Sequence, residues 1–141
     1  MGRFRPHVIF SAAITLDGKL ATRTGDSKLS SKVDKNRVHR LRSKVDAILI
    51  GKNTAKLDDP VLSVHNAKKK NPIRIILDSN ATIQNNSRIL RTSSKIPTII
   101  AVGERASKKN LQRLEKLPVQ IIVCGKNRMY QGRLLGGCCF Y

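Results

Sequence analysis

Short apolar runs alternate with longer amphipathic stretches along most of this chain. The runs are rich in β-prone residues and end in turn residues, whereas the longer stretches repeat apolar positions at helical spacing. The pattern predicts strands over residues 8–15, 47–50, 73–77, 96–102 and 119–123 and helices over residues 32–44 and 107–116. Such alternation is typical of an α/β domain with a largely parallel sheet.

The segment DAILIGKNTAKLDDPVLSV, residues 46–64, is the most informative part of the pattern. A short apolar run ends at Gly51, and Thr54, Asp58, Asp59 and Pro60 follow within what we expect to be one short loop. Ligand crevices in open α/β sheets lie beyond the carboxyl ends of the strands, so the spacing predicts a binding cleft here. Asp59 precedes Pro60 and is expected to be extended, which leaves Asp58 to face a pocket. The other interpretation of the two carboxylates is a capped turn.

Three further residues have one functional and one structural interpretation each. Asp78 ends the strand at 73–77 and either accepts a hydrogen bond from a cofactor ribose or closes a turn. Arg42 lies in a basic helix, where it either binds a phosphate or is solvated, and His65 is either an anion contact or a surface residue. The sequence shows no Ser-His-Asp order, no GxSxG motif and no metal-ligand spacing, so it does not indicate nucleophilic or metal catalysis.

The charge of the chain favours an anionic partner. The 141 residues include 28 Lys and Arg against 9 Asp and Glu, which gives a net charge of +19. The basic residues are dispersed and aromatic residues make up only 4%, which weighs against nucleic acid as the partner. No apolar run is long enough to span a bilayer. The three cysteines, two of them adjacent, form no disulfide or zinc framework, so we expect a cytoplasmic protein.

The apolar periodicity stops near the end of the chain. After Gly125 and Lys126 the sequence NRMYQGRLLGGCCFY has neither a helical nor a strand pattern. We therefore expect one domain over residues 1–128, an aberrant or disordered tail over residues 129–141, and a chain that is truncated or altered at its C-terminus.

Several ordered motifs together resemble one enzyme family. They are SAAITLDGKLAT, GDSKLSS, RVHRLRSKVDAILIGKNTAKLDDPVLSVH, NPIRIILDS and VCGKNR. The chain resembles the archaeal-type 2,5-diamino-6-ribosylamino-4(3H)-pyrimidinone 5′-phosphate reductases of riboflavin biosynthesis, which are similar to the reductase half of the bacterial bifunctional deaminase-reductase. The resemblance implies a dihydrofolate-reductase-like fold, a homodimer, and reduction of a ribosyl group to a ribityl chain by NADPH, or by NADH in its place.

The resemblance also assigns residues to the two ligands. For the cofactor it implies Ala13, Leu29, Thr54, Asp58, Ile76, Leu77, Asp78, Ser79 and Gly125. For the substrate it implies Ser27, Arg42, Leu62 and His65, with Arg42 and His65 as holders of the 5′-phosphate. It implies no catalytic acid–base pair, because the cofactor supplies the hydride.

This chain departs from the family after residue 128. The family continues into a helix, a strand and an acidic, glycine-rich EGGG-type loop that cradles the cofactor phosphates, and this sequence has no such loop. An active reductase and an inactive remnant of one therefore both fit. The alternatives are a basic nucleic-acid-binding module and a non-catalytic fragment that needs a partner chain. An open sheet without its last strands would also expose a pairing edge and lower solubility.

Overall fold

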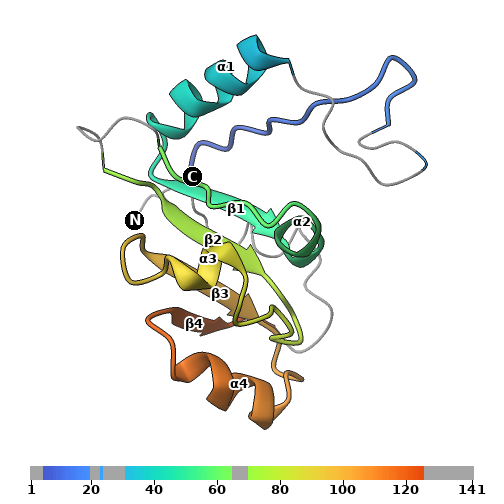
Figure 1. Ribbon diagram of the computed structural model, residues 1–141. Helices are drawn as coiled ribbons and strands as arrows, with labels where there is room; N and C mark the ends of the chain where they lie inside the picture. Colours follow the sequence, from blue (N-terminus) through green and yellow to red (C-terminus); the bar gives the residue numbers. More distant parts are fainter. Residues whose placement is uncertain (1–4, 20–22, 24–30, 65–69, 126–141) are drawn as a thin grey trace.

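The structure, a computed structural model, describes residues 5–19, 23, 31–64 and 70–125 (Figure 1). Its elements in chain order are α1 (Lys32–Arg42), β1 (Ala47–Gly51), α2 (Lys52–Leu57), β2 (Ile73–Leu77), α3 (Arg88–Arg91), β3 (Thr98–Val102), α4 (Lys108–Glu115) and β4 (Gln120–Val123). Strands and helices alternate from β1 onward, and the four strands, α1 and α4 correspond to elements that the sequence predicts.

The four strands form one sheet in the order β1-β2-β3-β4. Every neighbouring pair is parallel, and Ile76 of β2 lies between Ile50 of β1 and Ile100 of β3. This confirms the parallel sheet expected from the alternation of elements. Because all four strands run the same way, their carboxyl ends share one edge of the sheet.

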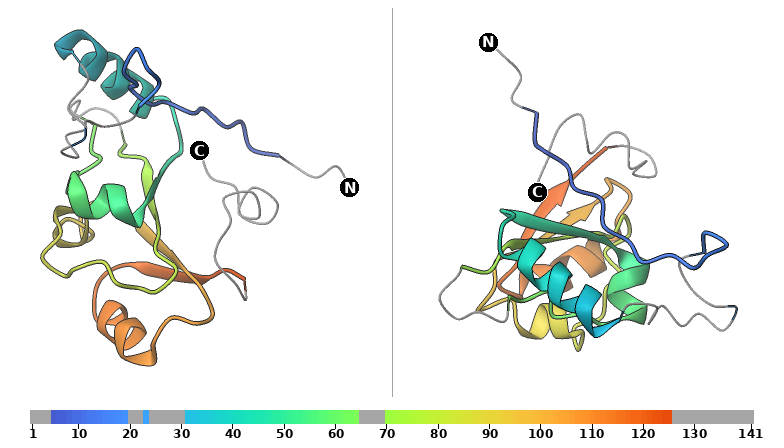
Figure 2. Two further views of the ribbon diagram at one scale, coloured as in Figure 1. Left: turned by 90° about the vertical axis from the view of Figure 1, so that its right-hand side faces the viewer. Right: turned by 90° about the horizontal axis from the view of Figure 1, so that it is seen from above.

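One face of the sheet carries the main hydrophobic core. Ala55 of α2, Ile89 of α3 and Leu114 of α4 pack there on Ile76 and Ile100. Figure 2 shows these three helices on the same side of the sheet. The opposite face carries a smaller apolar cluster around Ala47, Ile75 and Ile99.

The first of the two longer helices begins at its predicted residue, Lys32, and the second begins at Lys108, one residue after its predicted start. The Ser31 hydroxyl accepts a hydrogen bond from the backbone N–H of Asp34 at 3.2 Å, and that of Ser107 accepts one from Asn110 at 3.2 Å. Such N-caps satisfy donors that have no partner inside the helix. The first helix ends at Arg42, two residues before its expected end, and Ser43 caps it.

The strand predicted over residues 8–15 is wrong. These residues form no strand and run beside α1 (Figure 1), where Arg37 donates a hydrogen bond to the Ser11 hydroxyl at 3.5 Å. Phe10 is 86% exposed and Ile14 is 62% exposed. A β-prone sequence forms a strand only where a sheet edge pairs with its backbone, and this segment has no such partner among the described residues.

The turn expected after that segment is confirmed. The Thr15 N–H donates to the Lys19 carbonyl at 2.8 Å, and Gly18 adopts a left-handed conformation with φ of 77°. Glycine tolerates this backbone without a steric cost.

Two short helices, α2 and α3, were not predicted. Both have fewer than two full turns, so too few apolar positions repeat in them to show a helical period in the sequence.

Candidate functional site

The carboxyl edge of the sheet gathers residues from four loops. The strands end at Gly51, Leu77, Val102 and Val123, and the expected cofactor residues Thr54, Ser79 and Gly125 follow three of these ends. Backbone hydrogen bonds join the loops to one another. The Gly103 N–H donates to the Ser79 carbonyl at 2.9 Å, and the Glu104 N–H donates to the Gly125 carbonyl at 3.3 Å. The tertiary fold thus builds one continuous edge from residues far apart in sequence.

Two glycines shape this edge, Gly103 by allowing a close approach of two loops and Gly125 by its backbone conformation. A β-carbon on Gly103 would lie 3.2 Å from the Ser79 carbonyl oxygen, so a side chain there would push the ends of β2 and β3 apart. Gly125 has φ of 72°, a conformation that other residues rarely adopt.

Asp78 is completely buried at the end of β2. Its carboxylate accepts hydrogen bonds from the Ile83 N–H at 2.7 Å and from the Thr82 hydroxyl at 3.2 Å. The Ala81 N–H donates to the Asp78 carbonyl at 3.0 Å. In this structure Asp78 therefore organises the turn that follows β2. Ile76 is also completely buried, and Leu77 and Ser79 are partly exposed beside them.

Thr54 and Asp58 lie one turn apart on α2, and both are exposed. The Asp58 N–H donates to the Thr54 carbonyl at 3.0 Å. The loop expected over residues 54–60 is therefore wrong in its first half, because Lys52–Leu57 is helical and Asp58 caps it. The spacing of Thr54 and Asp58 nevertheless places them on one face of this helix.

The extended conformation expected for Asp59 is also wrong. Its φ is 38°, in the left-handed region, although Pro60 follows it. The Asp59 carboxylate accepts a hydrogen bond from the backbone N–H of Arg88 at 2.8 Å, and so satisfies the N-terminus of α3. This contact between residues 29 positions apart stabilises a conformation that the local sequence disfavours.

A groove of about 340 Å³ runs between α2 and residues 82–87. The two cations on its wall are Lys52 and Lys56 of α2. Its other lining residues are Asn53, Ala55, Asp59, Thr82, Ile83, Gln84, Asn86 and Ser87. Thr54 and Asp58 do not line it, since they project from the opposite face of α2.

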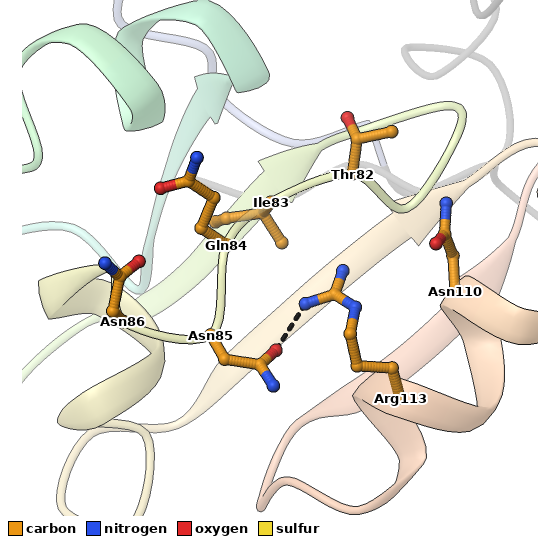
Figure 3. A pocket seen from close by; sticks show the side chains of 7 residues that line it. All are labelled: Thr82, Ile83, Gln84, Asn85, Asn86, Asn110 and Arg113. Atoms are coloured by element: carbon orange, nitrogen blue, oxygen red, sulfur yellow. Dashed lines mark hydrogen bonds between the residues drawn. The ribbon is translucent and has the colours of Figure 1, made fainter.

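A second, wider concavity of about 660 Å³ lies between the same loop and α4 (Figure 3). Asn85 and Arg113 point toward each other across it and are hydrogen-bonded. Arg113 also donates to the Ala81 carbonyl at 2.8 Å, and the Asn110 amide donates to the Asn80 carbonyl at 3.0 Å. Side chains of α4 thus hold residues 80–85 by hydrogen bonds, and the Asp78 carboxylate holds the same loop through Thr82 and Ile83.

Two of the residues expected on the substrate side, Arg42 and Leu62, are among the described residues. Arg42 is the last residue of α1, shortly before β1 begins, and burial lowers the pKa of its guanidinium. Leu62 is only 5% exposed and packs in the main core with φ of 56°. Ala13 is partly buried in the N-terminal segment. Three expected site residues, Ser27, Leu29 and His65, lie outside the described residues.

Arg74 is the polar centre of the core, and the sequence reasoning missed it. It is the second residue of β2, and it is 0% exposed. The guanidinium donates to the carbonyls of Val61, Ile89 and Ile96 at 2.9, 2.9 and 3.2 Å. It also donates to the hydroxyls of Thr92 and Thr98 at 2.8 and 2.6 Å. The sequence does contain one sign of a buried charge, because Arg74 is the single charged residue inside the apolar run IRIIL.

The described residues contain no group of three or more His, Cys, Asp or Glu that could hold a metal ion. Among the described helices, none combines the length and the apolar character that a membrane span requires.

Comparison with known proteins gives a consistent result. Residues 6–134 match the family model of the RibD C-terminal domain. The chain is 43% identical over 128 residues to the 2,5-diamino-6-ribosylamino-4(3H)-pyrimidinone 5′-phosphate reductase of Methanothermobacter thermautotrophicus, which covers 89% of this chain and 58% of that protein. It is 39% identical over 136 residues to the Aquifex aeolicus protein of the same name, which covers 93% of this chain and 60% of that protein. The chain thus spans about three fifths of the length of these curated relatives.

Solved structures show the same likeness. The Thermotoga maritima diaminohydroxyphosphoribosylaminopyrimidine deaminase/5-amino-6-(5-phosphoribosylamino)uracil reductase superposes with a TM-score of 0.63 at 28% identity, over 86% of this chain and 39% of that one. A pyrimidine reductase-like protein from Corynebacterium diphtheriae superposes with a TM-score of 0.71 at 20% identity, over 86% of this chain and 57% of that one, and supports the fold alone.

Proposed function

The chain belongs to the RibD C-terminal domain family, and from this premise we propose that it binds NADPH and reduces the ribosyl group of a 5′-phosphorylated diaminopyrimidinone to a ribityl chain. The family and the dihydrofolate-reductase-like α/β fold were both predicted from sequence motifs, and both are confirmed. The observation that carries the proposal is the position of Thr54, Ser79 and Gly125 after three strands of one parallel sheet. Ligands of open α/β sheets bind at this edge.

The donors at this edge fit a polyanionic dinucleotide. Thr54 offers an exposed hydroxyl, and Lys52 at the start of the same helix and Lys56 in its last turn add two ammonium groups. Cationic and hydroxyl donors of this kind form charge-assisted hydrogen bonds with phosphate oxygens.

We assign the remaining cofactor contacts along the same edge. Thr54 and Asp58 would orient the ligand from one face of α2, and Leu77, Ser79 and the Gly125 backbone from the ends of β2 and β4. Ile76 and Asp78 are buried, so their part is to hold the end of β2 in place. Ala13 and Leu29 complete the assigned set.

The substrate side would lie toward the opposite end of β1. Arg42 and Thr54 flank the two ends of this five-residue strand, which is roughly 17 Å long at about 3.3 Å per residue. A bound dinucleotide and substrate would therefore extend along the strand. Arg42 keeps its charge at neutral pH and would hold the 5′-phosphate, together with His65. Leu62 and Ser27 would line the same side.

When bound, the reduced nicotinamide supplies the hydride. The task of this chain is then to hold the sugar and the ring in reactive orientation, a contribution that can lower the barrier greatly without an acid–base pair.

NADPH binding by the purified chain, followed by fluorescence, tests the proposal. Asp58→Asn and Thr54→Val should each weaken binding about 10-fold, because each removes a polar contact worth about 1–1.5 kcal/mol. Glu115→Gln on the exposed surface of α4 changes a carboxylate away from this edge and should bind like the wild type. Thermal melts of all four proteins show whether the fold is intact.

Three outcomes would contradict the proposal. They are wild-type protein that does not bind NADPH, equal losses in Glu115→Gln and Asp58→Asn, and bound NADPH that is not consumed when the diaminopyrimidinone phosphate is added. The last outcome would leave cofactor binding in place and refute the reaction alone.

A further inference from the structure

We propose that residues 8–16 and the exposed side of α1 form a docking surface that binds the protein to an anionic lipid bilayer. This binding is additional to the proposed reduction and does not depend on it. Figure 1 shows both parts of the docking surface at one end of the molecule, beyond β1, with α4 at the opposite end.

The first observation is a concentration of apolar side chains. Among the described residues, eight large hydrophobic residues are exposed, and six of these lie on the docking surface. The six are Val8, Ile9, Phe10, Ile14, Leu16 and Val33. Phe10 is 86% exposed and Val33 is 79% exposed. Exposed apolar side chains that gather on one surface indicate an interaction site for a protein or a membrane.

The second observation is the orientation of the N-terminal segment, which runs as an elongated chain beside α1 (Figure 1). Alternate residues of an extended chain point to opposite sides, so Phe10 and Ile14 point the same way. On the other side, Ser11 accepts a hydrogen bond from Arg37 of α1 at 3.5 Å, and Ala13 is partly buried. One side of the segment therefore rests against the molecule, and the other presents apolar residues to solvent.

The third observation is the charge beside these apolar residues. Helix α1 has five Lys and Arg residues against one acidic residue, Asp34, and Asp34 forms an ion pair with Arg37 at 2.8 Å. Val33 and Arg40 lie one turn before and one turn after Arg37, so the three share the helix face that contacts the segment. Arg40 is exposed and has no carboxylate partner among the described residues. The apolar side chains are thus bordered by uncompensated positive charge.

This combination favours an anionic bilayer over the other partners of a basic surface. A two-fold dimer would bring the same surface of two copies together, and their cationic helices would repel each other. A nucleic-acid backbone would neutralise the cations but leave Phe10 and Ile14 in water. A bilayer with acidic headgroups satisfies both features, because its interface takes up apolar side chains and its surface potential attracts lysine and arginine.

Sedimentation of the full chain with lipid vesicles tests the inference. Wild-type protein should bind phosphatidylcholine vesicles with about 30% phosphatidylserine at least about 10-fold more tightly than pure phosphatidylcholine vesicles, which lack the negative surface potential. Phe10→Ser should weaken binding to the acidic vesicles about 10-fold, since a large apolar side chain no longer enters the interface. Arg40→Gln should weaken it about fivefold through the loss of one cation.

Two exposed residues outside the docking surface give matched controls. Leu57→Ser removes an apolar side chain of α2 that is 75% exposed, and Lys95→Gln removes a cation between α3 and β3. Both variants should bind the acidic vesicles like the wild type. All four substituted side chains are exposed, so each variant should melt within about 3 °C of the wild type, which separates a loss of binding from a loss of fold.

Several outcomes would overturn the inference. Wild-type protein that does not bind acidic vesicles, or that binds both vesicle compositions equally, would do so. Phe10→Ser that binds like Leu57→Ser, together with a loss in Arg40→Gln, would assign α1 to polyanions such as nucleic acid instead. A dimer seen by gel filtration that Phe10→Ser dissociates, in a protein that does not bind vesicles, would assign the surface to a second copy. NADPH binding is measured separately, so none of these outcomes changes the proposed function.

Discussion

Arg74 carries a positive charge into the interior of the molecule, and hydrogen bonds compensate it there. Its guanidinium binds segments before β2, within and just after α3, and leading into β3. The planar donors of arginine can serve several acceptors in fixed directions, which a lysine ammonium cannot. Burial lowers the pKa of Arg74 to about 10, so it remains charged at neutral pH. The folded chain binds this proton more weakly than the unfolded chain, so burial of the charge lowers the free energy of unfolding at neutral pH. This destabilisation decreases only as the pH rises above about 10.

We predict that Arg74→Lys lowers the free energy of unfolding by about 3 kcal/mol, because several buried carbonyls and hydroxyls lose their donor. Urea denaturation at neutral pH measures the change. Arg91→Lys, at an exposed position of α3, is the matched control and should cost less than about 0.5 kcal/mol. Equal changes in the free energy of unfolding of the two variants would contradict this prediction. They would show that the hydrogen bonds of Arg74 add no stability beyond the positive charge, which lysine retains.

At the scale of elements, α1 and α4 differ in the packing that stabilises them. Both begin at a serine N-cap, yet α1 buries none of its residues, whereas α4 places Leu114 in the core at 0% exposure. Most of the stability of a helix in a protein comes from packing of its apolar face. The N-cap is sufficient to define where each helix starts, and packing decides how firmly it is held.

We therefore expect amides in 32–42 to exchange with deuterium at least about 10-fold faster than those in 108–115, since local opening of an unpacked helix costs little. Hydrogen-exchange mass spectrometry on the intact chain measures both segments in one experiment. Equal protection of the two helices would mean that α1 packs against a part of the molecule outside the described residues.

At the scale of the whole molecule, charge is the dominant property. A net charge of +19 attracts phosphorylated ligands over a distance set by the ionic strength. The same charge underlies the alternative of a basic nucleic-acid-binding module. The homodimer implied by the family resemblance stays a prediction.

We predict that NADPH binding weakens several-fold as salt rises from about 50 to about 200 mM, because screening removes the long-range attraction. Fluorescence titrations at the two salt concentrations measure it. A short DNA duplex serves as the comparison, and it should bind more weakly than NADPH at the higher salt. Tighter DNA binding with a fall of about 1,000-fold over this range would favour the nucleic-acid alternative instead.

The sequence by itself determined the parts of this protein that depend on neighbouring residues. The run IRIIL became β2 with the predicted bounds, and Ser31 and Ser107 became N-caps, since strand propensity and capping act over a few positions. The order of its motifs also identified the family. Thr54 and Asp58 were correctly expected beyond the end of β1, although the helix between them was missed.

Only the tertiary structure decided what depends on distant partners. Arg74 contacts residues 13 to 24 positions away, and Asp59 adopts its left-handed conformation while it binds an amide 29 positions away. The apolar segment at 8–15 stayed unpaired because no sheet edge in the described structure meets it. The groove beside α2 likewise arises only when two loops pack together. Local patterns fix which elements form, but pairing, burial and concavity are properties of surfaces that the chain brings together only by folding.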